Sequence, residues 1–186
     1  MEMMLEMLKA IQSIRTPLFN QVFQWITMLG EDTFFIVLVT VVYWCIHKNF
    51  GYKMGLAYLT SAVINVALKE TFRIPRPFQL DEEIIPIRES TAGGYSFPSG
   101  HSQCASSLLT SLMIQLKKRW FYWFGALLIG LIAFSRMYLG VHTPMDVIAG
   151  VALGVGWVFV SNALFDYAER TERRELLLLL AVPILI

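Results

Sequence analysis

Long apolar runs without charged residues alternate with short polar segments along almost the whole chain. These runs cover residues 33–46, 54–68, 102–116, 120–135, 147–165 and 176–186. A membrane-spanning helix needs about 20 mostly apolar residues, and only the run at 147–165 approaches that length. Three others reach it when a polar residue near one end (Lys69, His101 or Arg136) is included. The pattern therefore predicts an all-α fold, a polytopic transmembrane helical bundle of about five to six spans.

Residues 1–30 precede the first of these runs and predict an N-terminal amphipathic helix. Thr16 can cap a helix, and Pro17 suits its first position. Apolar side chains then recur at helical spacing, namely Leu18, Val22, Trp25, Ile26 and Leu29. Polar residues between them favour an interfacial helix over a span, and a helix packed against the bundle is the alternative. We expect the main transmembrane domain at 31–168, then a basic loop and the start of a further apolar helix at 169–186.

The polar ends of the predicted spans fall on one side of the bundle. Short turns reverse successive helices, so segments 48–53 and 117–119 share one side. Segments 69–76, 98–101 and 136–146 share the other. A charge at membrane depth costs at least about 2.5–3.5 kcal/mol. Three spans that each carry a polar group near the same side therefore indicate one shared internal site.

Basic residues outside this candidate site gather on the opposite side: Lys48, Lys53, Lys117, Lys118, Arg119, Arg170, Arg173 and Arg174. The side rich in Lys and Arg is normally cytoplasmic, so we expect a multi-pass cell-membrane protein with an extracytoplasmic site. Only 16% of the residues are charged, against roughly 25% in soluble domains, which agrees with a bilayer partner. The net charge of +1 argues against nucleic acid as a partner.

The segment Pro98-Ser99-Gly100-His101 begins one of the long apolar helices. A helix N-terminus offers free backbone N–H groups and a positive dipole end to an anion. Gly100 permits a ligand to approach the backbone closely, the Ser99 hydroxyl can donate, and His101 is placed to give a proton. The plainer interpretation is an ordinary helix start with a capping serine.

A second segment places His142 just before another helix, with Thr143 as its cap and Asp146 in its first turn. The Asp146 carboxylate can accept the imidazole N–H, which fixes the tautomer and raises the basicity of the other nitrogen. Arg136 ends the preceding span. The plainer interpretation is that Asp146 only caps its helix.

A third segment contributes Lys69, at the end of a span, and Arg76, between Pro75 and Pro77, which hold the chain extended. A Lys point charge and an Arg fork together suit a phosphate. We interpret Arg73 as a flanking or headgroup contact. No Cys/His or carboxylate cluster in the sequence suggests a metal.

The three segments resemble the signature motifs of the type 2 phosphatidic acid phosphatase superfamily, in the same order. They read K-x6-RP at Lys69–Pro77, PSGH at Pro98–His101 and SR-x5-H-x3-D at Ser135–Asp146. The resemblance covers about residues 33–165. It implies a membrane hydrolase for lipid phosphates or polyprenyl pyrophosphates, in which 31–168 is the phosphatase domain. The three cations are enough to neutralise a phosphoryl group, so we expect no cofactor or metal.

The resemblance also implies a role for each site residue. His142 attacks phosphorus and becomes phosphohistidine, Asp146 orients it, and His101 protonates the leaving group. The phosphoryl oxygens are held by Lys69, Arg76, Ser99, Gly100 and Arg136.

Two alternatives remain open at this point. A lipid phosphotransferase would use the same site with an alcohol in place of water. A non-catalytic membrane protein that binds anions or lipids would keep the pocket but not the chemistry, yet the nucleophile, the acid and the cations are all present. A haloperoxidase fits worse, because membrane spans indicate a lipid substrate.

Overall fold

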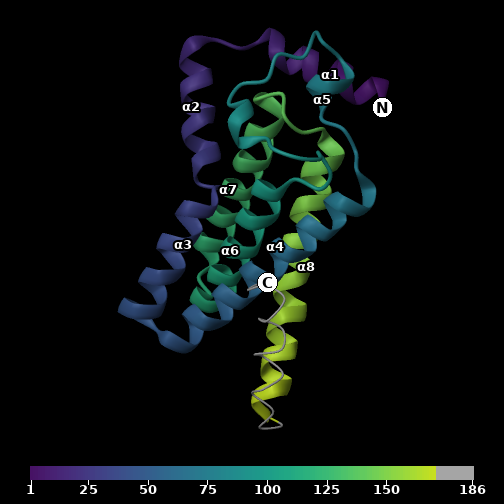
Figure 1. Cartoon of the computed structure of the whole chain (residues 1–186). Helices are drawn as coiled ribbons and strands as arrows, with labels where there is room; N and C mark the ends of the chain where they lie inside the picture. Colours follow the sequence, from purple (N-terminus) through teal and green to yellow (C-terminus); the bar gives the residue numbers. More distant parts are fainter. Residues whose placement is uncertain (171–186) are drawn as a thin grey trace.

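The computed structural model describes residues 1–170, and within that range every regular element is a helix (Figure 1). The elements are α1 (Glu2–Ser13), α2 (Pro17–Met28), α3 (Asp32–Val41), the π-helix η1 (Val42–Ile46), α4 (Lys48–Phe72), α5 (Pro77–Leu80), the 3-10 helix η2 (Glu89–Thr91), α6 (Gly100–Leu116), α7 (Arg119–Tyr138) and α8 (Pro144–Arg170). The predicted all-α bundle is confirmed.

Helix α6 lies at the centre of the bundle and packs against α4, α7 and α8. Two glycines of α8 make the closest of these contacts possible. A side chain at Gly150 would collide with the Ser99 carbonyl, and one at Gly154 would collide with the Gln103 carbonyl. Small residues let helix backbones approach closely in a membrane, and here they bring the start of α8 against the start of α6.

Polar side chains inside the bundle bond across the helices. Gln103 of α6 donates from Nε2 to both the carbonyl and the hydroxyl of Ser61, each at 2.8 Å, and its Oε1 accepts from Asn65 Nδ2 at 2.8 Å. Ser107 Oγ donates to the Gly154 carbonyl at 3.2 Å. These bonds join α4, α6 and α8 through groups that would be costly to leave unpaired in a bilayer.

The inward polar residues also affect how many spans can be recognised. In residues 1–170, α7 and α8 are long and apolar enough to cross a membrane, and α2 with α3–η1, bent by 46°, forms a third candidate. Helix α6 has 17 residues, and α4 carries Lys53 and Asn65 among its apolar residues. Two to three spans are therefore supported, and the predicted five to six are not confirmed.

The N-terminal residues form two helices instead of one continuous helix. Thr16 caps α2, with Oγ1 accepting from Phe19 N at 3.2 Å, and Pro17 occupies the first turn as predicted. Helix α2 packs against α7, which is the alternative considered above; a location at the membrane interface stays a prediction. Helix α1 lies against the segment between α5 and η2, where Lys9 pairs with Glu83 at 3.1 Å.

The two ends of the bundle differ in character. The segment 73–99, α1 and the start of α8 lie at one end, and the C-terminal part of α8 points away from it (Figure 1). The exposed residues Lys48 and Lys118 occupy the opposite turns. Of the segment predicted at 169–186, only the first two residues, which belong to α8, are within the described part of the chain.

Candidate active site

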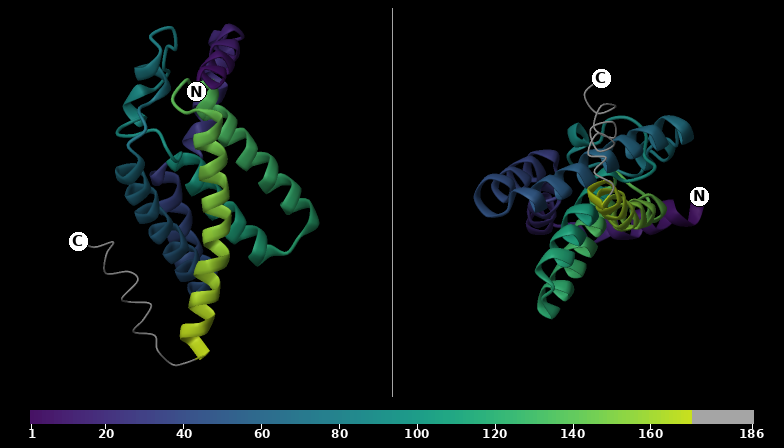
Figure 2. Two further views of the ribbon diagram at one scale, coloured as in Figure 1. Left: turned by 90° about the vertical axis from the view of Figure 1, so that its right-hand side faces the viewer. Right: turned by 90° about the horizontal axis from the view of Figure 1, so that it is seen from below.

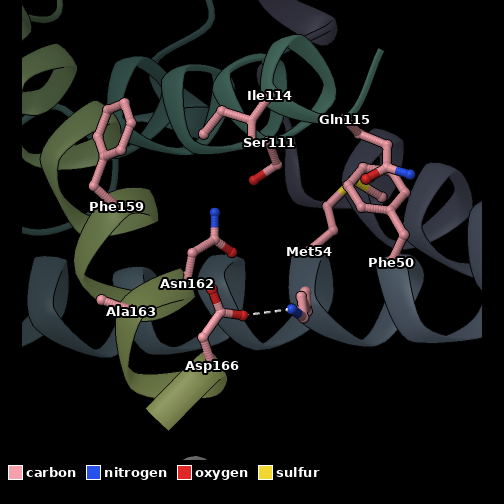
Figure 3. A pocket seen from close by; sticks show the side chains of 10 residues that line it. Phe50, Met54, Ser111, Ile114, Gln115, Phe159, Asn162, Ala163 and Asp166 are labelled. Atoms are coloured by element: carbon pink, nitrogen blue, oxygen red, sulfur yellow. Dashed lines mark hydrogen bonds and ion pairs between the residues drawn. The ribbon is translucent and has the colours of Figure 1, made fainter. Parts of the chain in front are cut away.

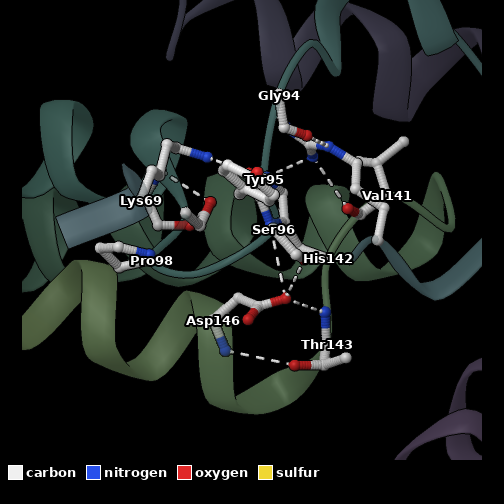
Figure 4. A network of polar contacts seen from close by, with 12 residues as sticks. Lys69, Gly94, Tyr95, Ser96, Pro98, Val141, His142, Thr143 and Asp146 are labelled. Carbon is white, nitrogen blue, oxygen red and sulfur yellow. Dashed lines mark hydrogen bonds and ion pairs between the residues drawn. The ribbon is translucent and has the colours of Figure 1, made fainter. Parts of the chain in front are cut away.

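A carboxylate at the start of α8 organises the site (Figure 4). Asp146 Oδ2 accepts from Thr143 N at 2.7 Å, and Thr143 Oγ1 accepts from Asp146 N at 3.3 Å, so the pair caps α8 in both directions. The same Oδ2 accepts from Ser96 Oγ at 2.6 Å and lies 3.5 Å from Nδ1 of His142. One oxygen therefore joins the helix start, the loop before α6 and the imidazole.

The buried imidazole of His142 has a defined orientation. Its Nε2 lies 3.1 Å from Arg76 Nη1. Because a guanidinium can only donate, Nε2 is the acceptor. The proton of a neutral imidazole is therefore on Nδ1, which lies 3.5 Å from both Ser96 Oγ and Asp146 Oδ2. Burial lowers the pKa of His142 below its ordinary value, and the bond to Asp146 only partly offsets this. The ring is thus neutral at pH 7, with a lone pair on Nε2.

Arg76 is buried in a frame of backbone carbonyls. Its Nε donates to Gly94 O at 3.1 Å, Nη2 to Gly93 O at 2.8 Å and Nη1 to Val141 O at 3.0 Å. Burial lowers the pKa of Arg76 to about 10, so it stays charged at pH 7. With His142 included, four of the five N–H groups of Arg76 face protein acceptors. Arg76 therefore mainly holds the backbone at Gly93 and Gly94 next to His142.

Arg136 has far fewer partners, although its side chain is 0% exposed. Nη1 donates to Thr27 Oγ1 at 2.8 Å. Among the described residues, Nε and Nη2 have no hydrogen-bond partner. The charge of Arg136 acts on His142, and its carbonyl accepts from Val141 N at 3.2 Å. A buried guanidinium with two unpaired nitrogens beside an imidazole is the donor arrangement that an anion would complete.

The start of α6 closes another side of the site. Ser99 caps α6, its Oγ accepting from Ser102 N at 3.4 Å and from Ser102 Oγ at 3.0 Å, while Ser99 N donates to Asp146 O at 3.0 Å. A side chain at Gly100 would meet only Asn65 Oδ1, at 3.4 Å, so protein packing does not require glycine here. His101 Nε2 is buried without a partner in the described part of the chain.

Lys69 completes the set of cations. It lies in the last turn of α4, and its Nζ donates to the Tyr95 carbonyl. Arg73 instead is exposed at the helix end beside Glu70, which agrees with a flanking position. The site has a formal charge of +2, from the three cations Lys69, Arg76 and Arg136 and the one carboxylate of Asp146. This charge matches that of a phosphate monoester dianion.

The family model of the PAP2 superfamily matches residues 50–170. The chain belongs to this superfamily. Phosphatidylglycerophosphatase B of Bacillus subtilis is 28% identical over 89% of this chain and 85% of that protein. The undecaprenyl-diphosphatase of Sulfolobus acidocaldarius is 34% identical over 57% of this chain and 52% of that protein. The chain spans only 36% of the human sphingosine-1-phosphate phosphatase 2 that it also matches.

Two PAP2-like crystal structures have the same fold. LpxE of Aquifex aeolicus superposes with a TM-score of 0.77 and 28% identity, covering 87% of this chain and 95% of that one. The transmembrane PAP2-type phosphatidylglycerolphosphate phosphatase of Bacillus subtilis superposes with a TM-score of 0.76 and 27% identity. The match covers 89% of this chain and 86% of that one. These matches confirm the predicted family and the predicted class of activity, a membrane phosphatase for lipid phosphates.

Sequence reasoning missed several groups that shape the PAP2 site. Two hydroxyls position charged residues: Ser96 bonds Asp146, and Thr27 bonds Arg136. Backbone carbonyls bind the remaining cations, those of Gly93 and Gly94 for Arg76 and that of Tyr95 for Lys69. A carbonyl leaves no signal in the sequence, and a lone Thr in an apolar stripe leaves almost none. In residues 1–170, no group of three or more His, Cys, Asp or Glu could hold a metal; metal independence stays a prediction.

Proposed function

We propose that this chain hydrolyses a lipid phosphate or lipid pyrophosphate through phosphohistidine at His142 Nε2. The observation that carries the proposal is the buried Arg136, whose Nε and Nη2 have no partner in the described residues, beside an imidazole oriented by Asp146. Phosphoryl transfer depends mainly on positioning and on neutralising charge on the phosphoryl oxygens. This site offers both.

The proposed reaction has two displacements. His142 Nε2 forms a bond to phosphorus as the bond to the leaving oxygen breaks, and His101 Nε2 gives that oxygen a proton. Water then attacks phosphorus, His101 takes a proton from it, and the N–P bond breaks to release phosphate. Covalent catalysis of this kind replaces one difficult step by two easier ones.

The residues that we propose as phosphate ligands differ in how many N–H or O–H groups they have free to donate. Arg136 has two free donors and is the principal ligand, with Lys69, the Ser99 hydroxyl and the Gly100 amide around the other oxygens. Arg76 keeps one N–H for phosphate, and its contact with His142 Nε2 must give way as phosphorus arrives. Protein packing does not require a glycine at position 100, which supports an approach of phosphate to this backbone.

The membrane arrangement that we propose has α3–η1, α4, α6, α7 and α8 as spans, with the site on the extracytoplasmic face. The Lys and Arg residues of the opposite turns support this orientation. The substrate class follows from the relatives, which are named for phosphatidylglycerophosphate, sphingosine-1-phosphate and undecaprenyl diphosphate. A phosphomonoester or pyrophosphate on a lipid is common to them.

The first prediction separates the two site histidines by their dependence on the leaving group. His142→Ala should abolish hydrolysis of every substrate. His101→Ala should slow an alkyl phosphate by about 10²–10⁴-fold, the usual size of general acid catalysis, and slow an aryl phosphate much less, because an aryl oxygen departs without a proton. Phosphate release from purified protein in excess chelator is the measurement.

His47→Ala is the matched control for this experiment. His47 is exposed at the opposite end, where its Nδ1 accepts from Phe50 N at 3.2 Å, and its loss should leave both rates unchanged. Equal slowing of both leaving groups in His101→Ala would contradict the acid role.

The second prediction concerns Thr27, which we assign as a positioning residue for Arg136. Thr27→Val keeps the shape but leaves Arg136 Nη1 unpaired. A buried hydrogen bond to a charged group is worth about 1.5–3 kcal/mol, so kcat/KM should fall by about 10–100-fold. Thr27→Ser keeps the hydroxyl and should retain activity within about threefold of wild type.

Thr40→Val provides the control, since Thr40 is an exposed threonine whose Oγ1 bonds only within its own helix, to Ile36 O at 2.7 Å. The assignment fails if Thr27→Val behaves like Thr40→Val, or if Thr27→Ser loses as much activity as Thr27→Val.

The third prediction tests the orientation in the membrane. In a Cys45→Ser background, in which the remaining Cys104 is buried, a membrane-impermeant thiol reagent on intact cells should label Glu82→Cys. It should not label Lys118→Cys until the cells are opened. Both positions are exposed at opposite ends of the bundle, so the reverse pattern would place the site in the cytoplasm.

A further inference from the structure

A long groove runs between α6, α7 and α8 below the active site. Its volume is about 520 Å³, and its lining includes Met113 of α6, Tyr122, Ile129 and Gly130 of α7, and Val151 and Phe159 of α8. The left view of Figure 2 shows α7 diverging from α8 toward the end away from the site. The groove therefore opens on the side of the bundle, where we place the bilayer.

The lining of this groove differs from that of the other large cavity. That cavity, between α4, α6 and α8, has a volume of about 420 Å³ and contains Asn162, Gln115 and the Lys53–Asp166 ion pair at 2.8 Å (Figure 3). Charges and amides of this kind would be poor partners for hydrocarbon. The groove along α7 carries no charged residue and suits an apolar chain.

Helix geometry fixes where the groove lies relative to the phosphate site. At 1.5 Å per residue, Val151 lies about 7.5 Å below Asp146, and Ile129 lies about 10 Å below Arg136. The far end, at Phe159 and Tyr122, lies about 20 Å from the same two residues. The groove thus begins directly under the site and reaches past the middle of a hydrocarbon core about 30 Å thick.

We propose that this groove holds a hydrocarbon chain of the lipid whose phosphate is bound at His142. The inference rests on the proposed function and adds a substrate-chain site to it. A lipid anchored by its phosphate must direct its chains into the bilayer from this end of the bundle, and the groove is framed by the same three helices that supply Ser99, Arg136 and Asp146. In lipid the gain comes from van der Waals contact and not from leaving water.

Gly130 offers a direct way to fill the groove. It lines the groove on α7, and a side chain built there would meet no atom within 4 Å. Replacing a helical glycine also favours the helix, so Gly130→Ala, Gly130→Leu and Gly130→Trp form a graded series. Gly156→Trp is the matched control, because Gly156 has equally open space but lines a different cavity of about 240 Å³, with Ile64 and Trp157.

The experiment compares two phosphatidates with one headgroup, dioleoyl and dibutanoyl, in detergent micelles. We expect Gly130→Trp to lower the ratio of long-chain to short-chain kcat/KM by about tenfold, the loss of about ten van der Waals contacts. Gly130→Leu should give a smaller loss, and Gly130→Ala and Gly156→Trp none.

An unchanged ratio in Gly130→Trp would overturn the proposal, since the groove would then hold only bulk lipid or detergent. An equal fall in Gly156→Trp would overturn it too. Should Gly130→Trp lose the short-chain rate through misfolding, the ratio in Gly130→Leu decides. A folded wild type that releases phosphate neither from phosphatidate nor from phosphatidylglycerophosphate, sphingosine-1-phosphate or undecaprenyl diphosphate contradicts the proposed function itself, which is a separate outcome.

Discussion

The burial of an arginine that forms no ion pair with the described residues is the constraint on which this site depends. Arg136 is fully buried, bonds only Thr27 among the described side chains and leaves two nitrogens unpaired. The charge of Glu31 acts on Arg136, but the ion pair of Glu31 is with Arg88, at 2.7 Å. A buried charge without a direct partner is unfavourable, and a phosphate dianion would supply that partner. We infer that this buried charge makes the site selective for a doubly charged anion, at some cost to the stability of the bundle.

The fold holds the rest of the site around that charge through a few contacts between helix ends. Gly150 and Gly154 bring α8 against α6, and the Asp146 carbonyl accepts from Ser99 N. The Asp146 carboxylate then caps α8 and faces His142 at the same time. Stability of the helix start and orientation of the imidazole therefore depend on the same side chain.

The sequence predicted the all-α class and a set of candidate site residues, but it did not predict the groups that position those residues. The segments that carry His101 and His142 lie side by side, since Ser99 N donates to the Asp146 carbonyl; the catalytic roles of the two histidines stay predictions. Thr27 was missed because its role depends on how α2 approaches α7. Hydropathy also averages the two faces of a helix, so α4, with Asn65 buried inside the bundle, falls short of a clear span. Helix α6 falls short by its length of 17 residues.

The most direct test of the account is to trap the covalent intermediate. Protein mixed with a ³²P-labelled lipid phosphate is quenched rapidly without acid and then treated with alkali, which spares phosphohistidine and removes acyl phosphate. We expect alkali-stable label on the wild type, in the peptide that contains His142, and none on His142→Ala. Label that survives in His142→Ala, or that is lost from the wild type in alkali, would contradict this expectation.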